Sequence, residues 1–160
     1  MTTKSTTQQI HFLLVGNSKE HLYRCVSHFH PDSVVLFTSQ DLADDTARFS
    51  KTLGETGPQV LEQINLSPFS DNALQSMTTA ILAANDKYGG KGALISVSLT
   101  GGTNLMVLAM ALVAISRRLP AFYCVNNEEQ TILSIDLLQN LSNNVDRLPF
   151  EKTITSGGIA

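Results

Sequence analysis

The chain has 160 residues, a size typical of one globular domain, and 42% of them are hydrophobic, enough to fill a core. Its formal net charge of −3 gives no overall basic field, which argues against binding of long nucleic acids but not of a short anionic ligand. Residues 1–9 lack the apolar core of a signal peptide, and the longest apolar run, 105–115, is too short to cross a bilayer. We therefore expect a cytoplasmic protein whose chain makes no membrane contact.

The first apolar run, 11–16, ends in glycine and is typical of a strand buried on both faces. A helix follows, with Leu22 and Cys25 at helical spacing and Asn17 or Ser18 available to cap it. The strand and helix pattern then repeats three times. The expected strands are 33–38, 60–66 and 93–99, and the expected helices are 41–53, closed by Gly54, 71–88, capped by Ser70 or Asp71, and 104–118.

Two further strands, 121–125 and 131–137, are separated by a polar turn that is too short for a crossover helix, which predicts an antiparallel pair. The whole pattern predicts an α/β fold with a mostly parallel six-stranded sheet flanked by helices and closed by a C-terminal β-hairpin. The expected organisation is a flexible N-terminus over 1–9, one domain over 10–139 and a polar tail over 140–160.

The most informative motif is Ser98-Leu99-Thr100-Gly101-Gly102-Thr103-Asn104-Leu105-Met106, in which a strand stops at two glycines and an apolar helix begins. The glycines permit a sharp turn and leave no side chain between the backbone and a ligand. Unpaired N–H groups and the positive end of the helix dipole favour a phosphate there. The turns at 16–18, 39–40 and 69–71 also follow strands and meet at the same sheet edge, so we expect an anion-binding site at that edge.

Other sites have weaker support in the sequence. The dinucleotide fingerprint, the P-loop and the nucleophile elbow are absent, and no general acid or base stands out. We expect no metal and no cofactor, because neither the histidines nor the cysteines complete a ligand set. The residues interpreted as structural are the surface or helix-end histidines His21, His28 and His30, the first-turn carboxylates Asp41, Asp44 and Asp45, and the buried free thiols Cys25 and Cys124.

The helix over 104–115 is apolar nearly all round. Such a helix needs cover on more than its sheet-facing side. We expect a homodimer interface to provide that cover.

The turn and its helix resemble the CARF family, the CRISPR-associated Rossmann-fold sensor domains. Their signature is a hydrophobic strand, a polar-Leu-Thr-Gly-Gly-Thr-Lys turn and an apolar helix with a Met near its start. The first strand, ending in Gly16-Asn17-Ser18, is similar to the family's other ligand-contacting turn, and the resemblance covers about residues 11–138. It implies a Rossmann-like homodimer that holds a cyclic oligoadenylate, usually the cyclic tetra-adenylate made as an alarm by type III CRISPR systems. A ring with two-fold symmetry matches an isologous interface.

The resemblance also implies a set of ligand-binding residues. Backbone N–H groups of the glycine turn would meet phosphates, and the other turns would meet ribose or adenine. The implied residues are Gly16, Asn17, Ser18, Ser39, Gln40, Phe69, Thr100, Gly101, Gly102, Thr103, Asn104 and Met106.

The chain departs from the family pattern in two respects. Asn104 replaces the usual lysine, which removes a cation that would offset ligand charge and stabilise a cleavage transition state. Sensors of this kind usually carry an effector domain, and the residues after Leu138 are too few for one, so an effector is expected on another chain or on a missing segment.

Three functions remain open from the sequence. The first is a sensor module that binds cyclic oligoadenylate. The second is a standalone, metal-independent ring nuclease in which the 2′-hydroxyl of the ligand attacks and Ser18 and Thr103 are the catalytic candidates. The third is a mononucleotide-binding α/β domain unrelated to CRISPR.

Overall fold

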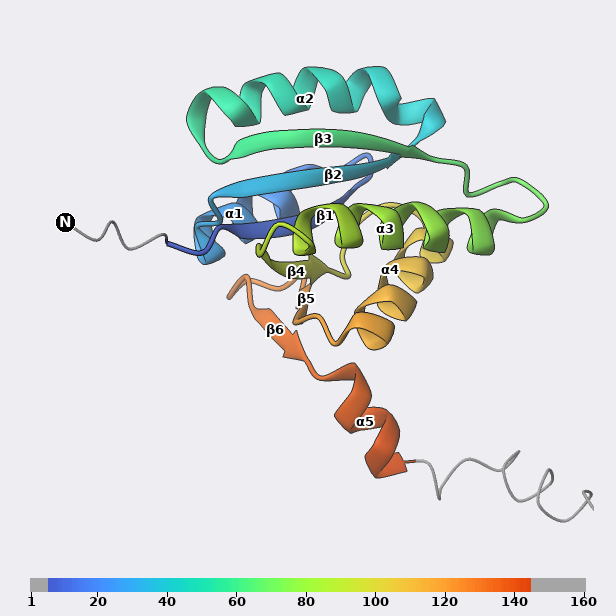
Figure 1. Cartoon of the computed structure of the whole chain (residues 1–160). Coiled ribbons are helices and arrows are strands. Elements are labelled where there is room, and N and C mark those ends of the chain that lie inside the picture. The colour runs from blue at the N-terminus through green and yellow to red at the C-terminus, as the bar shows by residue number, and fades with distance from the viewer. Residues whose placement is uncertain (1–5, 145–160) are drawn as a thin grey trace, which may run out of the picture.

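The computed structural model of the chain (Figure 1) describes residues 6–144. Residues 1–5 of the expected N-terminal segment and 145–160 of the expected tail lie outside the described residues. The elements follow in the order β1 (Gln9–Val15), α1 (Glu20–Phe29), β2 (Ser33–Ser39), a 3-10 turn (Gln40–Leu42), α2 (Ala43–Thr56), β3 (Gln59–Leu66), α3 (Ala73–Gly89), β4 (Leu94–Ser98), α4 (Asn104–Arg117), β5 (Ala121–Cys124), β6 (Ile132–Ile135) and α5 (Leu137–Asn144).

The six strands form one sheet in the order β3-β2-β1-β4-β5-β6. The strands from β3 to β5 pair in parallel, and β5 pairs antiparallel with β6. The expected α/β class and mostly parallel sheet are therefore confirmed. Strands β2 and β3 follow β1 on one side of the sheet, and β5 and β6 follow β4 on the other. The direction in which successive strands are added therefore reverses between β1 and β4. Helix α5 follows the antiparallel pair and spans the position at 139–140 where the sequence places the start of the tail.

Helices cover both faces of the sheet and form a hydrophobic core on each. Successive side chains of β1 point alternately into these two cores. Phe12 and Leu14 pack in the cluster that includes side chains of α3 and α4. Leu13 and Val15 pack in the cluster that includes side chains of α1 and α2. All four side chains are fully buried, which explains why the β1 sequence is continuously apolar rather than alternating.

Two helix ends differ from the expectation. Helix α2 continues through Gly54 to Thr56. A glycine inside a helix costs only about 1 kcal/mol relative to alanine, which burial of the apolar face of α2 offsets. Helix α3 begins after Asn72, and neither Ser70 nor Asp71 caps it.

The apolar helix α4 is buried on one side only. Met110 and Val113 have no exposed surface, whereas Leu108 is 46% exposed and Leu112 is 40% exposed. The side of α4 that carries these two leucines is therefore the side that an additional contact would have to bury. Within residues 6–144, no helix has both the length and the apolar composition needed to span a bilayer.

Candidate functional site

The turns that follow β1 and β4 touch each other. A Cβ added to Gly16 would lie 2.9 Å from the amide nitrogen of Gly102. Gly101 and Gly102 have φ angles of 103° and 67°, a left-handed conformation that glycine adopts at little cost. Because β1 and β4 are neighbours at the reversal of strand order, the three glycines stand where ligands of open α/β sheets bind.

The side chains of Thr100 and Thr103 both accept hydrogen bonds from backbone N–H groups. The Oγ1 atom of Thr100 accepts a hydrogen bond from the amide of Cys124 at 2.8 Å, which ties the turn to the end of β5. The Oγ1 atom of Thr103 accepts from the amide of Met106 at 3.2 Å and caps α4. Each hydroxyl keeps its own proton to donate to a ligand. Asn104, the first residue of α4, is exposed beside them.

Met106 supports the glycine turn from below. Its side chain is completely buried, and a Cβ on Gly102 would lie 2.9 Å from its terminal methyl carbon. The expected contact of Met106 with the ligand stays a prediction, and the role that the structure shows for this side chain is support of the turn. The side chain fills the core under the turn because the apolar face of α4 starts there.

Asn17 and Ser18 are exposed in the turn after β1. The alternative interpretation of these residues as helix caps is wrong, because α1 begins at Glu20 with Lys19 at its N-cap position and no side-chain cap. Their side chains lie next to Gly16 in sequence and are accessible to a ligand bound at the glycine turn.

Lys19 is a site residue that the sequence analysis missed. Its Nζ atom donates to the carbonyl oxygens of Gly16 and Asn17 and to Oδ2 of Asp45, the last at 2.7 Å. The lysine side chain is only 18% exposed. Its hydrogen bond and charge hold the pKa of the Asp45 carboxyl below its usual value. The lysine thus braces the turn after β1 and ties it to the first turn of α2.

A signal for this arrangement exists in the sequence. A cation at a helix N-terminus opposes the helix dipole, so Lys19 requires a local partner. The sequence alone does not identify this partner, because Asp45 is 26 positions away. In addition, Asp45 is already accounted for as a carboxylate in the first turn of a helix.

His21 lies underneath the glycine turn. Its Nε2 atom is 3.1 Å from the carbonyl oxygen of Leu14, which can only accept, so Nε2 carries a proton. Burial lowers the pKa of His21, and the charges of Lys19 and Arg24 act in the same direction against the opposing Leu14 hydrogen bond. The imidazole is therefore neutral near pH 7. His21 is the second residue of α1, so its expected position at a helix end is confirmed, whereas its interpretation as a surface residue is wrong because the residue is buried.

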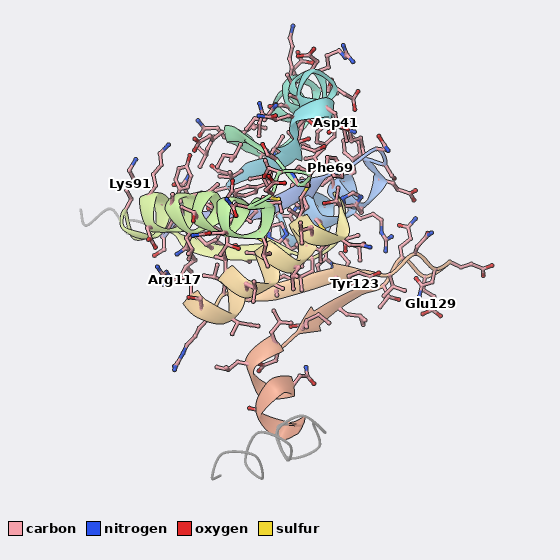
Figure 2. All side chains as sticks on the ribbon, turned by 90° about the vertical axis from the view of Figure 1, so that its right-hand side faces the viewer. Asp41, Phe69, Lys91, Arg117, Tyr123 and Glu129 are labelled. Atoms are coloured by element: carbon pink, nitrogen blue, oxygen red, sulfur yellow. The ribbon has the colours of Figure 1, made fainter. Side chains whose placement is uncertain are left out.

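The turns after β2 and β3 supply the other expected residues (Figure 2). Phe69 is 81% exposed and Gln40 is also exposed, whereas the Ser39 side chain is buried. Figure 2 looks onto this edge, with Phe69 and Asp41 after β3 and β2 and with Tyr123 below them. Among residues 6–144, no side-chain hydrogen bond joins these turns to the glycine turn. The structure therefore places these described turns on one edge of the sheet without a side-chain hydrogen bond between them and the glycine turn.

Titratable side chains do not gather into a metal site in the described part of the chain: no group of three or more His, Cys, Asp or Glu forms there. His28 and His30 are exposed and separate from buried His21. The expected burial of both cysteines is confirmed. Their proximity was missed, because the Sγ atoms of Cys25 and Cys124 lie 3.1 Å apart across 99 sequence positions.

Comparison with known proteins gives a likeness of fold without a likeness of sequence. No family model and no curated protein matches the chain. The structure is similar to protein VC1899 from Vibrio cholerae, with a TM-score of 0.71 and 12% identity over 81% of this chain and 34% of that one.

Two similar structures contain a bound cyclic nucleotide. Enterococcus italicus Csm6 bound to cyclic hexa-2′-fluoro-hexa-dAMP has a TM-score of 0.66 and 17% identity over 88% of this chain and 47% of that one. Can2 from Sulfobacillus thermosulfidooxidans in complex with cyclic tetra-adenylate has a TM-score of 0.65 and 17% identity over 79% of this chain and 34% of that one. The chain spans less than half the length of each of these proteins. Its fold is that of proteins solved with cyclic oligonucleotides of adenosine, as the resemblance to the CARF family predicts.

Proposed function

We propose that the chain is a CARF domain that binds a cyclic oligoadenylate, in the first place cyclic tetra-adenylate, as a sensor in type III CRISPR signalling. The contact between Gly16 and Gly102 carries this proposal. It brings two small-residue turns together at the reversal of strand order, where backbone N–H groups can approach a phosphate. The fold of the Csm6 and Can2 complexes supports the same ligand class.

Each part of the ligand has a suited partner at this edge. The N–H groups of Gly101, Gly102 and Thr103 suit a phosphate, because no Cβ screens the two glycine amides. The exposed polar side chains of Asn17 and Ser18 suit ribose hydroxyls. The exposed ring of Phe69 suits an adenine face, since bases stack on aromatic side chains.

We further propose that two chains bind one ring as a homodimer. Leu108 and Leu112, one helical turn apart, form an exposed apolar stripe on α4. Tyr123 of β5 pairs with Leu133 of β6, and both are more than 40% exposed. Tyr123 lies two residues after Ala121, which packs in the α3 and α4 core, so it points to the α4 side of the sheet. An isologous contact through this surface would bury exposed apolar area.

Ring cleavage is the less favoured activity. Lys19 places a cation beside the turn after β1, but its Nζ atom already binds two carbonyl oxygens and the Asp45 carboxylate. Asn104 supplies no charge in the place of the usual family lysine. A site whose exposed edge carries a lysine already paired with a carboxylate holds a phosphate through backbone dipoles and gains little extra stabilisation of a developing charge from that lysine.

The test measures binding and ligand integrity together. The purified chain is titrated with cyclic tetra-adenylate, cyclic hexa-adenylate and ATP by calorimetry, and each ligand is then analysed by chromatography. We expect one intact tetra-adenylate ring per two chains. Linear di-adenylate would establish a ring nuclease instead, and a preference for ATP by a monomer would establish a mononucleotide-binding domain.

A matched pair of variants locates the site. Ser18→Tyr places a bulky ring beside the glycine turn and should abolish binding, whereas Ser27→Tyr places the same ring on the exposed side of α1 and should not. Both positions are exposed, so both variants should unfold at the temperature of the parent chain. Equal binding by the two variants would show that the ligand does not bind at this edge of the sheet.

A further inference from the structure

Two thiols from distant parts of the chain meet behind the glycine turn. Cys25 lies on α1 and Cys124 ends β5, and their Sγ atoms are 3.1 Å apart. Since a disulfide bond is about 2.05 Å long, the sulfur atoms need to approach by only about 1 Å. We propose that Cys25 and Cys124 form a redox modification site, in which a peroxide oxidises the thiol pair to a disulfide that fastens the glycine turn to α1.

The two sulfur atoms have different roles. The two thiols are hydrogen-bonded, and once Cys124 is a thiolate only Cys25 can donate. This hydrogen bond, aided by the charge of Arg24 and by Thr100, outweighs burial and lowers the pKa of Cys124 to about 7. The same contact and burial raise the pKa of Cys25. Cys124 is therefore the thiolate that reacts first, and Cys25 is the resolving thiol.

The reaction balances with hydrogen peroxide as the oxidant. The Cys124 thiolate attacks one peroxide oxygen, the O–O bond breaks, and hydroxide leaves and takes up a proton, which gives a sulfenic acid and one water. The Cys25 sulfur then attacks the sulfenic sulfur, the S–O bond breaks, and a second water leaves with the Cys25 proton. Two thiols are oxidised and one peroxide is reduced to two waters. Peroxide is small enough for the limited exposure of Cys124, which is 3%.

Direct contacts connect the thiol pair to the turn. The amide of Cys124 donates to Oγ1 of Thr100 at 2.8 Å. The Cys25 Sγ atom lies 3.9 Å from Oγ of Ser98, and that oxygen accepts the Thr100 amide at 3.3 Å. A covalent link between α1 and β5 would therefore restrain both groups that hold Thr100. This consequence for the turn does not depend on which ligand binds there.

The first experiment identifies the bond. The full chain is treated with hydrogen peroxide and digested without reductant. We expect the intact protein to lose the mass of two hydrogen atoms, the peptides that contain Cys25 and Cys124 to be joined, and dithiothreitol to restore both thiols. Thiols that persist at peroxide concentrations sufficient to oxidise glutathione, or cross-links only between chains, would overturn the proposal.

Single variants separate the two roles. Cys25→Ala removes the resolving thiol and also the hydrogen bond that lowers the pKa of Cys124, so oxidation of Cys124 should be slower than in the parent chain. The sulfenic acid that does form has no resolving partner and should accumulate and react with dimedone. Cys124→Ala should give no dimedone adduct at Cys25 under the same conditions. Both substitutions keep a small apolar side chain in the core, and thermal unfolding checks that each variant is folded. A dimedone adduct at Cys25 in Cys124→Ala, with no adduct at Cys124 in Cys25→Ala, would show that Cys25 reacts first. That result would overturn the proposed roles of the two thiols.

The second experiment tests the link to the turn. Amide hydrogen exchange of residues 99–103 should slow several-fold on oxidation of the parent chain and should not respond to peroxide in Cys25→Ala. Unchanged exchange in a protein that demonstrably carries the disulfide would overturn the coupling. Neither experiment requires cyclic oligoadenylate, so the outcome is independent of the proposed function.

Discussion

His21 lies directly beneath Gly101, so closely that a Cβ on the glycine would collide with Nε2 of the imidazole. The same Cβ would also meet the carbonyl oxygen of Leu14, and the φ angle of Gly101 is 103°. The turn can rest on the end of β1 only because position 101 carries no side chain. Glycine is thus required there for steric reasons as well as for its backbone conformation.

Gly101→Ala should therefore destabilise the fold by about 2 kcal/mol or more, because it adds a backbone collision to an unfavourable φ angle. Gly54→Ala is the matched control. Gly54 lies within α2, and a Cβ added there would meet no atom within 4 Å, so the change should stabilise by up to about 1 kcal/mol. Urea denaturation measures both. Equal effects of the two substitutions would contradict this account of the turn.

Lys19→Met should weaken cyclic tetra-adenylate binding about tenfold, because the turn after β1 loses the hydrogen bonds from Nζ to its two carbonyl oxygens. The global stability should change by only about 1 kcal/mol, since the carbonyl groups regain water. Calorimetry and urea denaturation measure the two quantities. Lys51→Met, at an exposed position of α2, is the control and should leave binding unchanged.

Phe69→Ala should lower ligand affinity without lowering stability. The ring is 81% exposed, so its removal takes little from the core. The loss of one stacked base corresponds to about 1–3 kcal/mol of binding free energy, or roughly fivefold to more than a hundredfold in the dissociation constant. Phe69→Tyr keeps an aromatic face and should bind like the parent chain. If both variants bind as tightly as the parent, the base is not stacked on this residue.

The free energy of unfolding should fall between pH 6.5 and pH 4 because of His11. This imidazole is stacked on Phe29, hydrogen-bonded to Ser96 and fully buried, and burial lowers its pKa from 6.5 to about 4. The unfolded chain binds the proton near pH 6.5, whereas the folded chain binds it only near pH 4. Stability is therefore complete above pH 6.5 and is lost as the pH falls, by about 3 kcal/mol in total.

His11→Phe should remove most of this pH dependence while it keeps a ring against Phe29 and Phe122. His28→Gln removes an exposed imidazole and should retain the dependence. Urea denaturation at several pH values compares the slopes. The same slope in all three proteins would assign the effect to other groups.

Leu108→Glu together with Leu112→Glu should prevent formation of the proposed dimer, because both side chains are exposed on one stripe of α4. Leu94→Glu is the control: Leu94 is 60% exposed but starts β4, at the opposite edge from the glycine turn. Sedimentation measures the mass of each variant. A monomeric parent chain, or a Leu94 variant that dissociates as readily, would contradict the proposed interface.

The sequence was sufficient to predict the sheet and the meeting of two of its turns at the carboxyl edge. Continuous apolar runs predict buried parallel strands, and the two glycines after residue 100 predict a turn at the carboxyl edge. The contact of Gly16 with the glycine turn confirms that two of the expected turns meet. The end of α2 predicted at Gly54 is wrong, because the helix continues to Thr56. A glycine inside a helix is tolerated when the apolar face of the helix is buried.

What the sequence could not provide were partners brought together by tertiary structure. Lys19 and Asp45, and likewise Cys25 and Cys124, are adjacent only after the sheet has formed. The side of α4 on which Met106 lies also depends on packing, because an almost wholly apolar helix has no pattern that distinguishes its buried face.

The central pairing of the sheet has a consequence for the order of folding. His11 of β1 and Ser96 of β4 are hydrogen-bonded at a separation of 85 positions, whereas β1 and β2 are joined by one short helix. Because closing a long loop costs more entropy than closing a short one, β1 to β3 should assemble before β4 docks. A chain emerging from the ribosome has no glycine turn against β1 until β4 and α4 have been synthesised. Binding of the proposed ligand would then begin only when the second half of the domain is in place, so an incomplete chain could not compete with finished chains for it.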